Sequence, residues 1–208
     1  MKKEELDSLI KISAYSAILL TLLLLLLNDS IEELSTIFRA VTTSVSIVVL
    51  FWGLYFKWLW KYCPFKYLLY RPNISGTWKG ILASDWKDKN GLLIQPKIFF
   101  IVIRQNFLDT NITTFTDNFI GVSYAENLLL NDARGEKKLT YLYRKDTADV
   151  GIQESNEGAC ELRINERQPM NMEGRYWSNI KTKGIIKVIK LSDDIIISFQ
   201  EGLTLTEK

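Results

Sequence analysis

The sequence predicts two parts: a hairpin of two transmembrane helices, followed by an all-β domain that folds as an eight-stranded antiparallel barrel. Two observations predict this division. Long apolar segments lie at about 9–27 and 38–60, and nothing later in the chain resembles them. The rest of the chain consists of short runs rich in β-branched and aromatic residues, separated by turn-forming residues. We therefore expect an anchor at 1–62, a connector at 63–72 and a barrel domain at 73–208.

The first apolar segment is predicted to stay in the protein as a membrane helix. A cleaved signal peptide is the alternative, because Lys2 and Lys3 precede the apolar run. Acidic residues interrupt that basic leader, however, and no small-residue cleavage site follows Leu27. Both apolar segments also approach the roughly 20 residues that cross a bilayer core.

The positions of the cations predict the orientation of the hairpin. Basic residues precede the first helix and follow the second, whereas only Arg39 lies between the two helices. The positive-inside rule therefore places both termini and the β-domain in the cytoplasm, with a tight loop outside. Aromatic residues cluster at the end of the second helix, where their rings favour the headgroup layer. This arrangement predicts a multi-pass membrane protein in contact with membrane lipid.

The second helix carries small and hydroxyl residues on one face. Thr42, Ser46 and Gly53 are spaced by four and seven residues, so they lie on the same side of a helix. Such a face lets helices approach closely within lipid. It either packs against the first helix of the same chain, near Ser13 and Ala17, or mediates association between chains, and the sequence favours neither.

The β-domain is predicted from its pattern of short runs. About 135 residues follow the connector, enough for one domain with its own core. Pro64 and Pro72 bracket the connector and make it short and stiff. The expected strands, eight or nine in number, are 77–83, 97–105, 112–116, 119–125, 139–144, 159–164, 173–178, 184–191 and 195–199.

Alternation within these runs favours a closed barrel, which presents two different faces. Leu139, Tyr141 and Tyr143 alternate with more polar neighbours along one run. The domain opens with Gly-Thr-Trp-Lys-Gly at 76–80, similar to the first strand of lipocalin-like barrels, although a core tryptophan beside a turn explains the motif equally well. An eight-stranded barrel either fills its interior with side chains or holds one small ligand.

Several kinds of chemistry are missing from the sequence. The chain contains no histidine, and Cys63 and Cys160 lack metal-ligand spacing. We expect two free thiols on the reducing side of the membrane, with no metal and no cofactor. No Walker-type glycine loop is present either. Nothing in the sequence recommends an enzyme.

The charge of the β-domain argues against binding of long nucleic acid. From residue 73 onward the sequence has 18 Lys and Arg against 18 Asp and Glu. Proteins that bind long nucleic acid usually carry a basic stripe, and this domain is neutral. Aromatic residues beside cations would instead suit a small nucleotide, although such residues also populate barrel walls and rims.

The order of these features along the whole chain resembles one family. The helix hairpin, the Pro-bracketed connector, the Gly-Thr-Trp-Lys-Gly start and the stretch Met172–Asn179 with Thr182 and Gly184 after it occur in that order. The chain is similar to the bacterial two-transmembrane, β-strand-rich effectors of cyclic-oligonucleotide-based antiphage signalling systems (CBASS), the β-barrel counterparts of STING-type receptors. The resemblance implies a location in the bacterial inner membrane and a cyclic dinucleotide or related cyclic oligonucleotide as ligand. It also implies a homo-oligomer on activation and membrane disruption that causes abortive infection.

The ligand-binding candidates rest on side-chain chemistry. Aromatic rings stack on bases, guanidinium groups bind phosphates, and a hydroxyl contacts a base edge or ribose. The candidates are Tyr141, Tyr143, Tyr176 and Trp177 for stacking, Arg104, Arg144 and Arg175 for phosphate, and Thr182 for the base edge or ribose. Neighbouring residues of a strand face opposite ways, so Tyr176 cannot point inward together with Arg175 and Trp177.

Two functions of other classes stay open. A membrane-tethered carrier of lipids or other small molecules would have a largely apolar barrel interior with few inward cations. A membrane-anchored protein-binding scaffold would have an exposed apolar patch and a solid interior.

Overall fold

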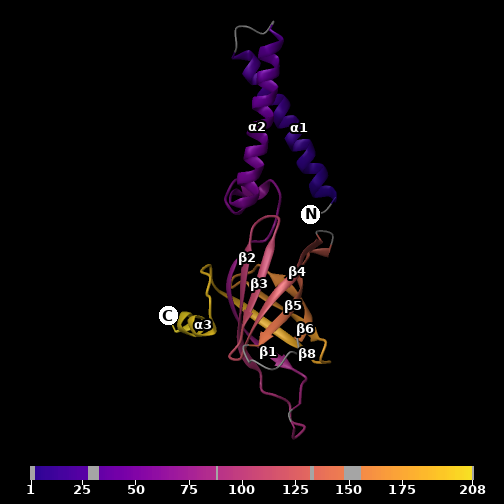
Figure 1. The fold of residues 1–208 in the computed structure, drawn as a ribbon, viewed down its shortest axis with the longest axis vertical. Coiled ribbons are helices and arrows are strands. Elements are labelled where there is room, and N and C mark those ends of the chain that lie inside the picture. Colours follow the sequence, from indigo (N-terminus) through magenta and orange to yellow (C-terminus); the bar gives the residue numbers. More distant parts are fainter. Residues whose placement is uncertain (1–2, 28–32, 88, 132–133, 148–155, 208) are drawn as a thin grey trace. The chain divides into compact units, whose positions relative to one another are not determined.

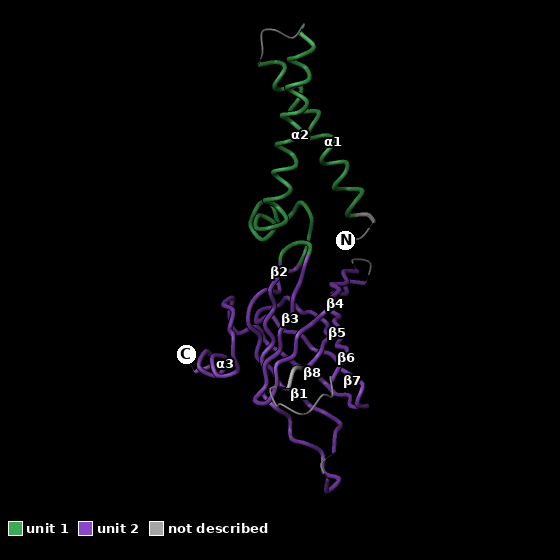
Figure 2. The backbone as a smooth tube through the Cα atoms, in the orientation of Figure 1, with its two compact units in different colours: residues 1–71, 106–108 green, residues 72–105, 109–208 purple. Residues whose placement is uncertain are grey.

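The computed structural model describes residues 3–27, 33–87, 89–131, 134–147 and 156–207. It divides into two units, coloured separately in Figure 2. The first unit contains residues 1–71 together with 106–108, and the second contains residues 72–105 and 109–208. The predicted tight loop between the helices falls largely on 28–32, outside the described residues.

The first unit is a helical hairpin with two short 3-10 turns after it. Helix α1 (Lys3–Leu26) and helix α2 (Leu34–Lys57) are both long and apolar enough to cross a membrane. The 3-10 turns η1 (Leu59–Lys61) and η2 (Phe65–Tyr67) follow. The sequence prediction of two N-terminal apolar helices is confirmed.

The face of α2 that packs within the first unit is not the face with the small and hydroxyl residues. The buried residues of α2 are Ala40, Ser44, Val48, Trp52 and Tyr55. Trp52 donates a hydrogen bond of 2.8 Å from its indole nitrogen to the Ser13 hydroxyl. Thr42, Ser46 and Gly53 are exposed, and the Thr42 and Ser46 hydroxyls bond to carbonyls of their own helix. The alternative that this face packs against α1 is therefore not realised.

The second unit is a closed barrel of eight antiparallel strands in sequence order, with β8 returning to β1 (Figure 1). The predicted fold class is confirmed. The strands are β1 (Gly76–Ser84), β2 (Lys97–Gln105), β3 (Thr110–Phe115), β4 (Phe119–Asn131), β5 (Glu136–Thr147), β6 (Asn156–Asn165), β7 (Asn171–Ser178) and β8 (Lys183–Ser192).

The barrel interior is filled by apolar side chains. Alternate residues of each strand point inward, and Trp78, Ile101, Leu139 and Leu162 are fully buried there. The Trp78 indole nitrogen donates to the Ile74 carbonyl oxygen at 3.0 Å, which satisfies its polar atom inside the core. The motif at 76–80 is thus the start of β1, with a core tryptophan.

The ninth predicted strand, 195–199, is wrong. The chain there leads into helix α3 (Phe199–Thr206), whose first turn is capped by Ser198. The Ser198 hydroxyl accepts from the Glu201 amide, as in a capping box, and the Glu201 carboxylate accepts from the amide of Ile197, the residue before the cap. A Cβ at Gly202 would meet the Phe100 ring at 2.5 Å, so this glycine lets α3 approach β2 closely.

The outer wall beneath α3 forms a second apolar cluster. Phe100 and Val102 of β2 pack there with Phe115 of β3 and Ile196. The edge of the Phe199 ring meets Phe100 with ring centroids 5.5 Å apart. Strand β2 is therefore buried on both faces, which explains why its sequence is apolar without interruption.

A candidate ligand site at one end of the barrel

The barrel mouth lies at the end that carries the β1–β2, β3–β4, β5–β6 and β7–β8 connections. Inward-facing residues from seven strands and from the turn between β3 and β4 meet there. They are Leu82, Phe99, Thr114, Thr116, Phe119, Tyr141, Tyr143, Lys145, Tyr176 and Ile186. The free volume inside the mouth is only about 30 Å³, close to the share of one water molecule in the liquid. The mouth is thus nearly closed, although its lining is polar and aromatic.

Three tyrosines dominate the mouth. The rings of Tyr141 and Tyr143 lie 6.1 Å apart, and Tyr176 hydrogen-bonds with Ser84. Burial raises the pKa of all three phenols, so they remain neutral hydrogen-bonding groups at neutral pH. Gly184 leaves room for the Tyr176 ring, because a Cβ at this position would lie 2.6 Å from it.

Lys145 places a cation at the mouth. Its ammonium nitrogen lies 4.4 Å from the centroid of the Phe119 ring and 5.9 Å from that of Tyr143. Such cation–π contacts compensate in part for lost hydration. Burial lowers the pKa of Lys145, and no ion pair of this residue is present among the described residues. A ligand phosphate at the mouth would supply the missing counter-charge.

A larger groove, here called the rim groove, lies on the outside of the barrel beside the mouth. Its volume is about 590 Å³, within the range of ordinary small-ligand sites. Its lining residues are Ala83, Ser84, Asp85, Leu93, Arg175, Tyr176, Trp177, Lys183, Gly184 and Ile185. Tyr176 lines both the mouth and the rim groove, so the two spaces share one wall.

The rim groove has aromatic and cationic side chains, the types that can contact nucleotides. Trp177 is 50% exposed and offers a large aromatic face, while Arg175 and Lys183 are exposed cations. The β1 end and the start of β8 are held together by Asp85, whose carboxylate accepts from the Lys183 amide at 2.9 Å and whose amide donates to the Lys183 carbonyl oxygen at 2.9 Å. The groove therefore rests on a fixed strand pair.

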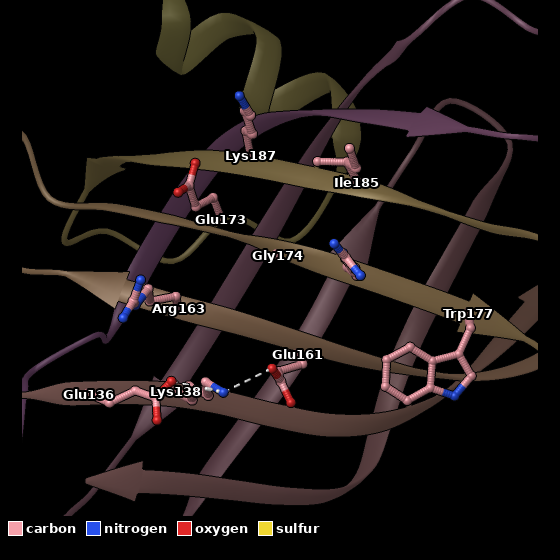
Figure 3. A pocket seen from close by; sticks show the side chains of 10 residues that line it. Glu136, Lys138, Glu161, Arg163, Glu173, Gly174, Trp177, Ile185 and Lys187 are labelled. Carbon is pink, nitrogen blue, oxygen red and sulfur yellow. Dashed lines mark ion pairs between the residues drawn. The ribbon is translucent and has the colours of Figure 1, made fainter. Parts of the chain in front are cut away.

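A third space, the wall groove, continues along the outside of β5–β8 (Figure 3). Its volume is about 570 Å³, and it shares Arg175, Trp177 and Ile185 with the rim groove. Charged side chains of both signs line it, and Lys138 pairs with Glu136 at 2.9 Å and with Glu161 at 3.2 Å. The wall groove presents three carboxylates beside its four cations, whereas the rim-groove lining has one carboxylate, that of Asp85.

Six of the eight sequence-predicted ligand residues line the mouth or the rim groove, or lie in the turn beside them. Tyr141 and Tyr143 line the mouth, and Arg175, Tyr176 and Trp177 line the rim groove. Thr182 lies in the turn between β7 and β8, where its hydroxyl oxygen is 2.7 Å from the Ser178 hydroxyl oxygen. The alternation along β7 places Tyr176 inward and its two neighbours outward.

The two remaining arginines line neither the mouth nor the rim groove. Arg104 is exposed near the other end of β2, opposite Asn111 of β3, and the structure does not bring it near the mouth. Arg144 is exposed on the outer wall of β5, and its guanidinium donates two hydrogen bonds, of 2.9 and 3.0 Å, to Glu157. Geometry gives neither residue a place in the rim groove.

The sequence prediction missed several residues of the site. Lys145 continues the alternation of Leu139, Tyr141 and Tyr143 by one more step, so this signal was present in the sequence. Asp85 and Leu93 lie outside the predicted strands, and no local pattern marks them as neighbours of Trp177. Both cysteines are free, as predicted, with Cys160 buried and Cys63 exposed. Among the described residues, no group of His, Cys, Asp and Glu has an arrangement that would hold a metal ion.

The fold places the chain among small closed β-barrels that follow apolar helices able to span a membrane. The model of the family "Cap15, cyclic dinucleotide receptor domain" matches residues 69–190, more than half of the chain. The chain belongs to this family. It is also similar to the "CD-NTase-associated protein 15" of Escherichia albertii, with 27% identity over 168 residues that cover 74% of this chain and 81% of that protein. The resemblance to the CBASS effectors is confirmed.

Proposed function

We propose that the chain is a membrane-anchored receptor that binds a cyclic dinucleotide or related cyclic oligonucleotide at the rim groove and mouth of its barrel. The observation that carries the proposal is the composition of the rim groove. An exposed indole, a tyrosine ring and two cations surround about 590 Å³ of open space. Base stacking and phosphate pairing are the interactions that these groups make with nucleotides. Membership of a cyclic dinucleotide receptor family supports the same ligand class.

Individual residues take separate roles in this proposal. Trp177 and Tyr176 stack on bases, and Arg175 and Lys183 pair with phosphates. At the mouth, Lys145 binds a phosphate oxygen, while Tyr141 and Tyr143 line the floor beneath it. Thr182 contacts a base edge or the ribose. The barrel interior itself holds no dinucleotide, because apolar side chains fill it.

The effect of the ligand is assembly followed by membrane disruption. A ligand shifts an assembly equilibrium only if it binds one arrangement of chains more tightly than another. Helices α1 and α2 cross the inner membrane, and both termini and the barrel lie in the cytoplasm. The exposed face with Thr42, Ser46 and Gly53 packs between chains. Disruption of the membrane kills the infected cell before phage are released. This outcome is called abortive infection.

The experiment is a titration of the full-length protein in nanodiscs with a panel of cyclic dinucleotides and trinucleotides, followed by heat release and thermal stability. A ligand that binds the folded state raises its apparent stability by mass action. Saturable binding of one member that is weakened by Trp177→Ala supports the proposal. Absence of binding across the panel by folded protein contradicts it.

A second function, protein binding, has specific support. The interior is solid, and the outer wall exposes Ile81, Ile98, Ile185 and Ile189, as a scaffold would require. A carrier of lipids finds less support, because the free volume in the mouth is far too small for an acyl chain. Genetic linkage to a nucleotidyltransferase would favour the receptor over the scaffold.

A further inference from the structure

Strand β4 is paired along its whole length on one side only. Strand β4 pairs with β5 from Phe119 to Asn131, except at the bulged residue Tyr124. On its other side, β4 pairs with β3 at just three positions, 120–122. After these pairs, the Ile112 amide donates to the Ser123 hydroxyl at 2.9 Å instead of to a backbone carbonyl. The β2–β3 and β4–β5 hairpins diverge toward their turns (Figure 1), and no described strand pairs with the free side of 125–131.

This free edge has the backbone groups that a further strand needs. Alternate residues of a strand direct their N–H and C=O groups toward opposite neighbours, so about half of those in 125–131 point away from β5. Exposed edges are usually protected by lysine, proline, bulges or a covering segment. The edge contains neither lysine nor proline, and Glu126 is its only charged residue. The one bulge, between Ser123 and Ala125, lies before the edge rather than within it.

We propose that this edge pairs with the same edge of a second copy of the chain, antiparallel and related by a two-fold axis at Leu128. Leu128 is the midpoint of 125–131, so this register makes the largest number of pairs. In a two-fold pairing centred on a residue, even-numbered residues meet even-numbered residues and odd-numbered residues meet odd-numbered ones. The backbone N–H and C=O groups of the two partners therefore point toward the same side of their strands. The proposal deepens the assembly step of the proposed function and rests on it for its biological role.

The side chains of the edge are compatible with themselves in this register. Leu128 meets Leu128 of the second copy, and Asn127 meets its Leu129. Glu126 meets Leu130 of the second copy, so no like charges lie opposite each other, an arrangement that would be unfavourable. A register centred on Glu126 would instead place two carboxylates face to face.

A cation is available near the glutamate of the second copy. Leu130 pairs with Lys137 of β5, so the two side chains lie on the same face of the sheet. Glu126 of a second copy would lie two strand spacings from Lys137, roughly 10 Å between Cα atoms, within the combined reach of the two side chains. Lys137 already pairs with Glu166, and the added carboxylate would extend that pair into a network across the interface.

Cross-linking tests the proposed register directly. In full-length protein carrying Cys63→Ser, the added Leu128→Cys places two thiols beside the two-fold axis, within reach of the short cross-linker bis-maleimidoethane. The matched control is Ile189→Cys, at a residue that is 52% exposed on the outer wall of β8. We expect covalent dimers of the Leu128→Cys protein in nanodiscs at a yield at least tenfold above the control. Equal yields, or no dimer with Leu128→Cys, overturn the proposal.

A charge on the edge tests the same interface without a cross-linker. Leu129 is 47% exposed, so Leu129→Lys introduces an edge lysine at little cost to the fold, and Ile189→Lys is the matched control. We expect the dissociation constant of the dimer to rise at least tenfold in Leu129→Lys alone, as measured by mass photometry. Unchanged assembly of the folded Leu129→Lys protein contradicts the proposal.

The two proposals fail in different ways. Cross-linking is measured without nucleotide and with cyclic di-GMP or cyclic GMP–AMP. If the Leu128→Cys protein forms dimers but binds no member of the cyclic nucleotide panel, the proposed edge interface is supported and the proposed ligand is wrong. If the protein binds a nucleotide but is not cross-linked in either condition, the proposed receptor function is supported and the proposed interface is wrong.

Discussion

The interior and the rim of the barrel are built from the same strands but differ in their exposure to solvent. Trp78 and Tyr176 belong to the inward rows of β1 and β7, whereas Trp177, the next residue of β7, is half exposed. The interior row is packed and has its polar atoms satisfied, as Trp78 shows. The outer row at the rim leaves aromatic faces and cations free. We infer that the interior maintains the fold and that the rim is available for a ligand.

The largest expected effect tests the interior. Trp78→Ala removes a fully buried ring and its hydrogen bond, and we expect a loss of about 3–5 kcal/mol in the free energy of unfolding. Trp177→Ala, at the half-exposed position, should change stability by no more than about 0.5 kcal/mol. Guanidinium unfolding of full-length protein in detergent micelles measures both. Similar losses in the two variants would break the distinction between interior and rim.

The pH dependence of stability tests the dryness of the interior. Burial raises the pKa of the Cys160 thiol to about 12, from an ordinary value of 9.0. Because the folded pKa is the higher one, the contribution is fully present below about pH 9 and is lost as pH rises toward 12. Its size is on the order of a few kcal/mol.

Cys160→Ala provides the control for that measurement. The stability advantage of the natural chain over this variant should shrink between pH 8 and pH 11. Parallel stability curves across this range would mean that the thiol is solvated and the interior wetter than described. Buried Tyr141, whose pKa is also raised by burial, adds to the alkaline loss in both proteins.

At the rim, the expected effects are on ligand affinity rather than stability. Trp177→Ala should weaken binding of the cyclic nucleotide by about 1–3 kcal/mol, or roughly 5- to 150-fold, the usual value of a base–aromatic stack. Tyr124→Ala is the matched control, since Tyr124 is 54% exposed on β4 and far from the rim groove in sequence and strand order. Isothermal titration should show weaker binding by Trp177→Ala than by Tyr124→Ala. Equal affinities of the two variants would mean that the rim groove is not the site.

Arg175 and Arg144 both lie at this end of the barrel, but they are expected to differ in their effect on ligand binding. Arg175 is expected to pair with a phosphate, so Arg175→Ala should weaken binding about tenfold at low salt and less at high salt. Arg144 is engaged with Glu157 on the outer wall, so Arg144→Ala should leave affinity unchanged. Titrations at two salt concentrations distinguish the pair. A larger effect of Arg144 would move the site to the outer wall of β5.

The smallest expected effect concerns the two faces of α2. Gly53 is exposed and has no neighbouring atom within 4 Å of a built Cβ, so Gly53→Leu should not destabilise the hairpin. It should nevertheless reduce association between chains in liposomes two- to threefold, measured by energy transfer between labelled copies. Ile47→Ala is the control, because Ile47 is 45% exposed and lies about 120° around the helix from the tested face. Equal energy transfer in all three proteins would exclude the face with Thr42, Ser46 and Gly53 as an interface.

Local pattern was sufficient to predict the eight strands, because period-two alternation is imposed by the pleat itself. The same pattern failed at 195–199, where β-branched residues precede a helix. The Ser198 and Glu201 capping box was the stronger signal, since it satisfies backbone amides that a strand would use otherwise.

The site was predicted less completely than the fold. Parity shows that Tyr176 and Trp177 face opposite ways, but only closure of the barrel decides which of them is inside. Arg104 and Arg175 have the same chemistry in the sequence, yet the strand register places them near opposite ends of the barrel. Contacts such as Asp85 with Lys183 join residues far apart in the chain, and no local pattern contains that information.

The most direct test of the central claim is a calorimetric titration of the full-length protein in nanodiscs with cyclic dinucleotides, repeated with Trp177→Ala, Arg175→Ala and Tyr124→Ala. We expect saturable binding of one cyclic dinucleotide, weakened about fivefold or more by the two rim variants and unchanged by Tyr124→Ala. Binding of equal strength in all four proteins, or no binding by folded protein, would contradict it.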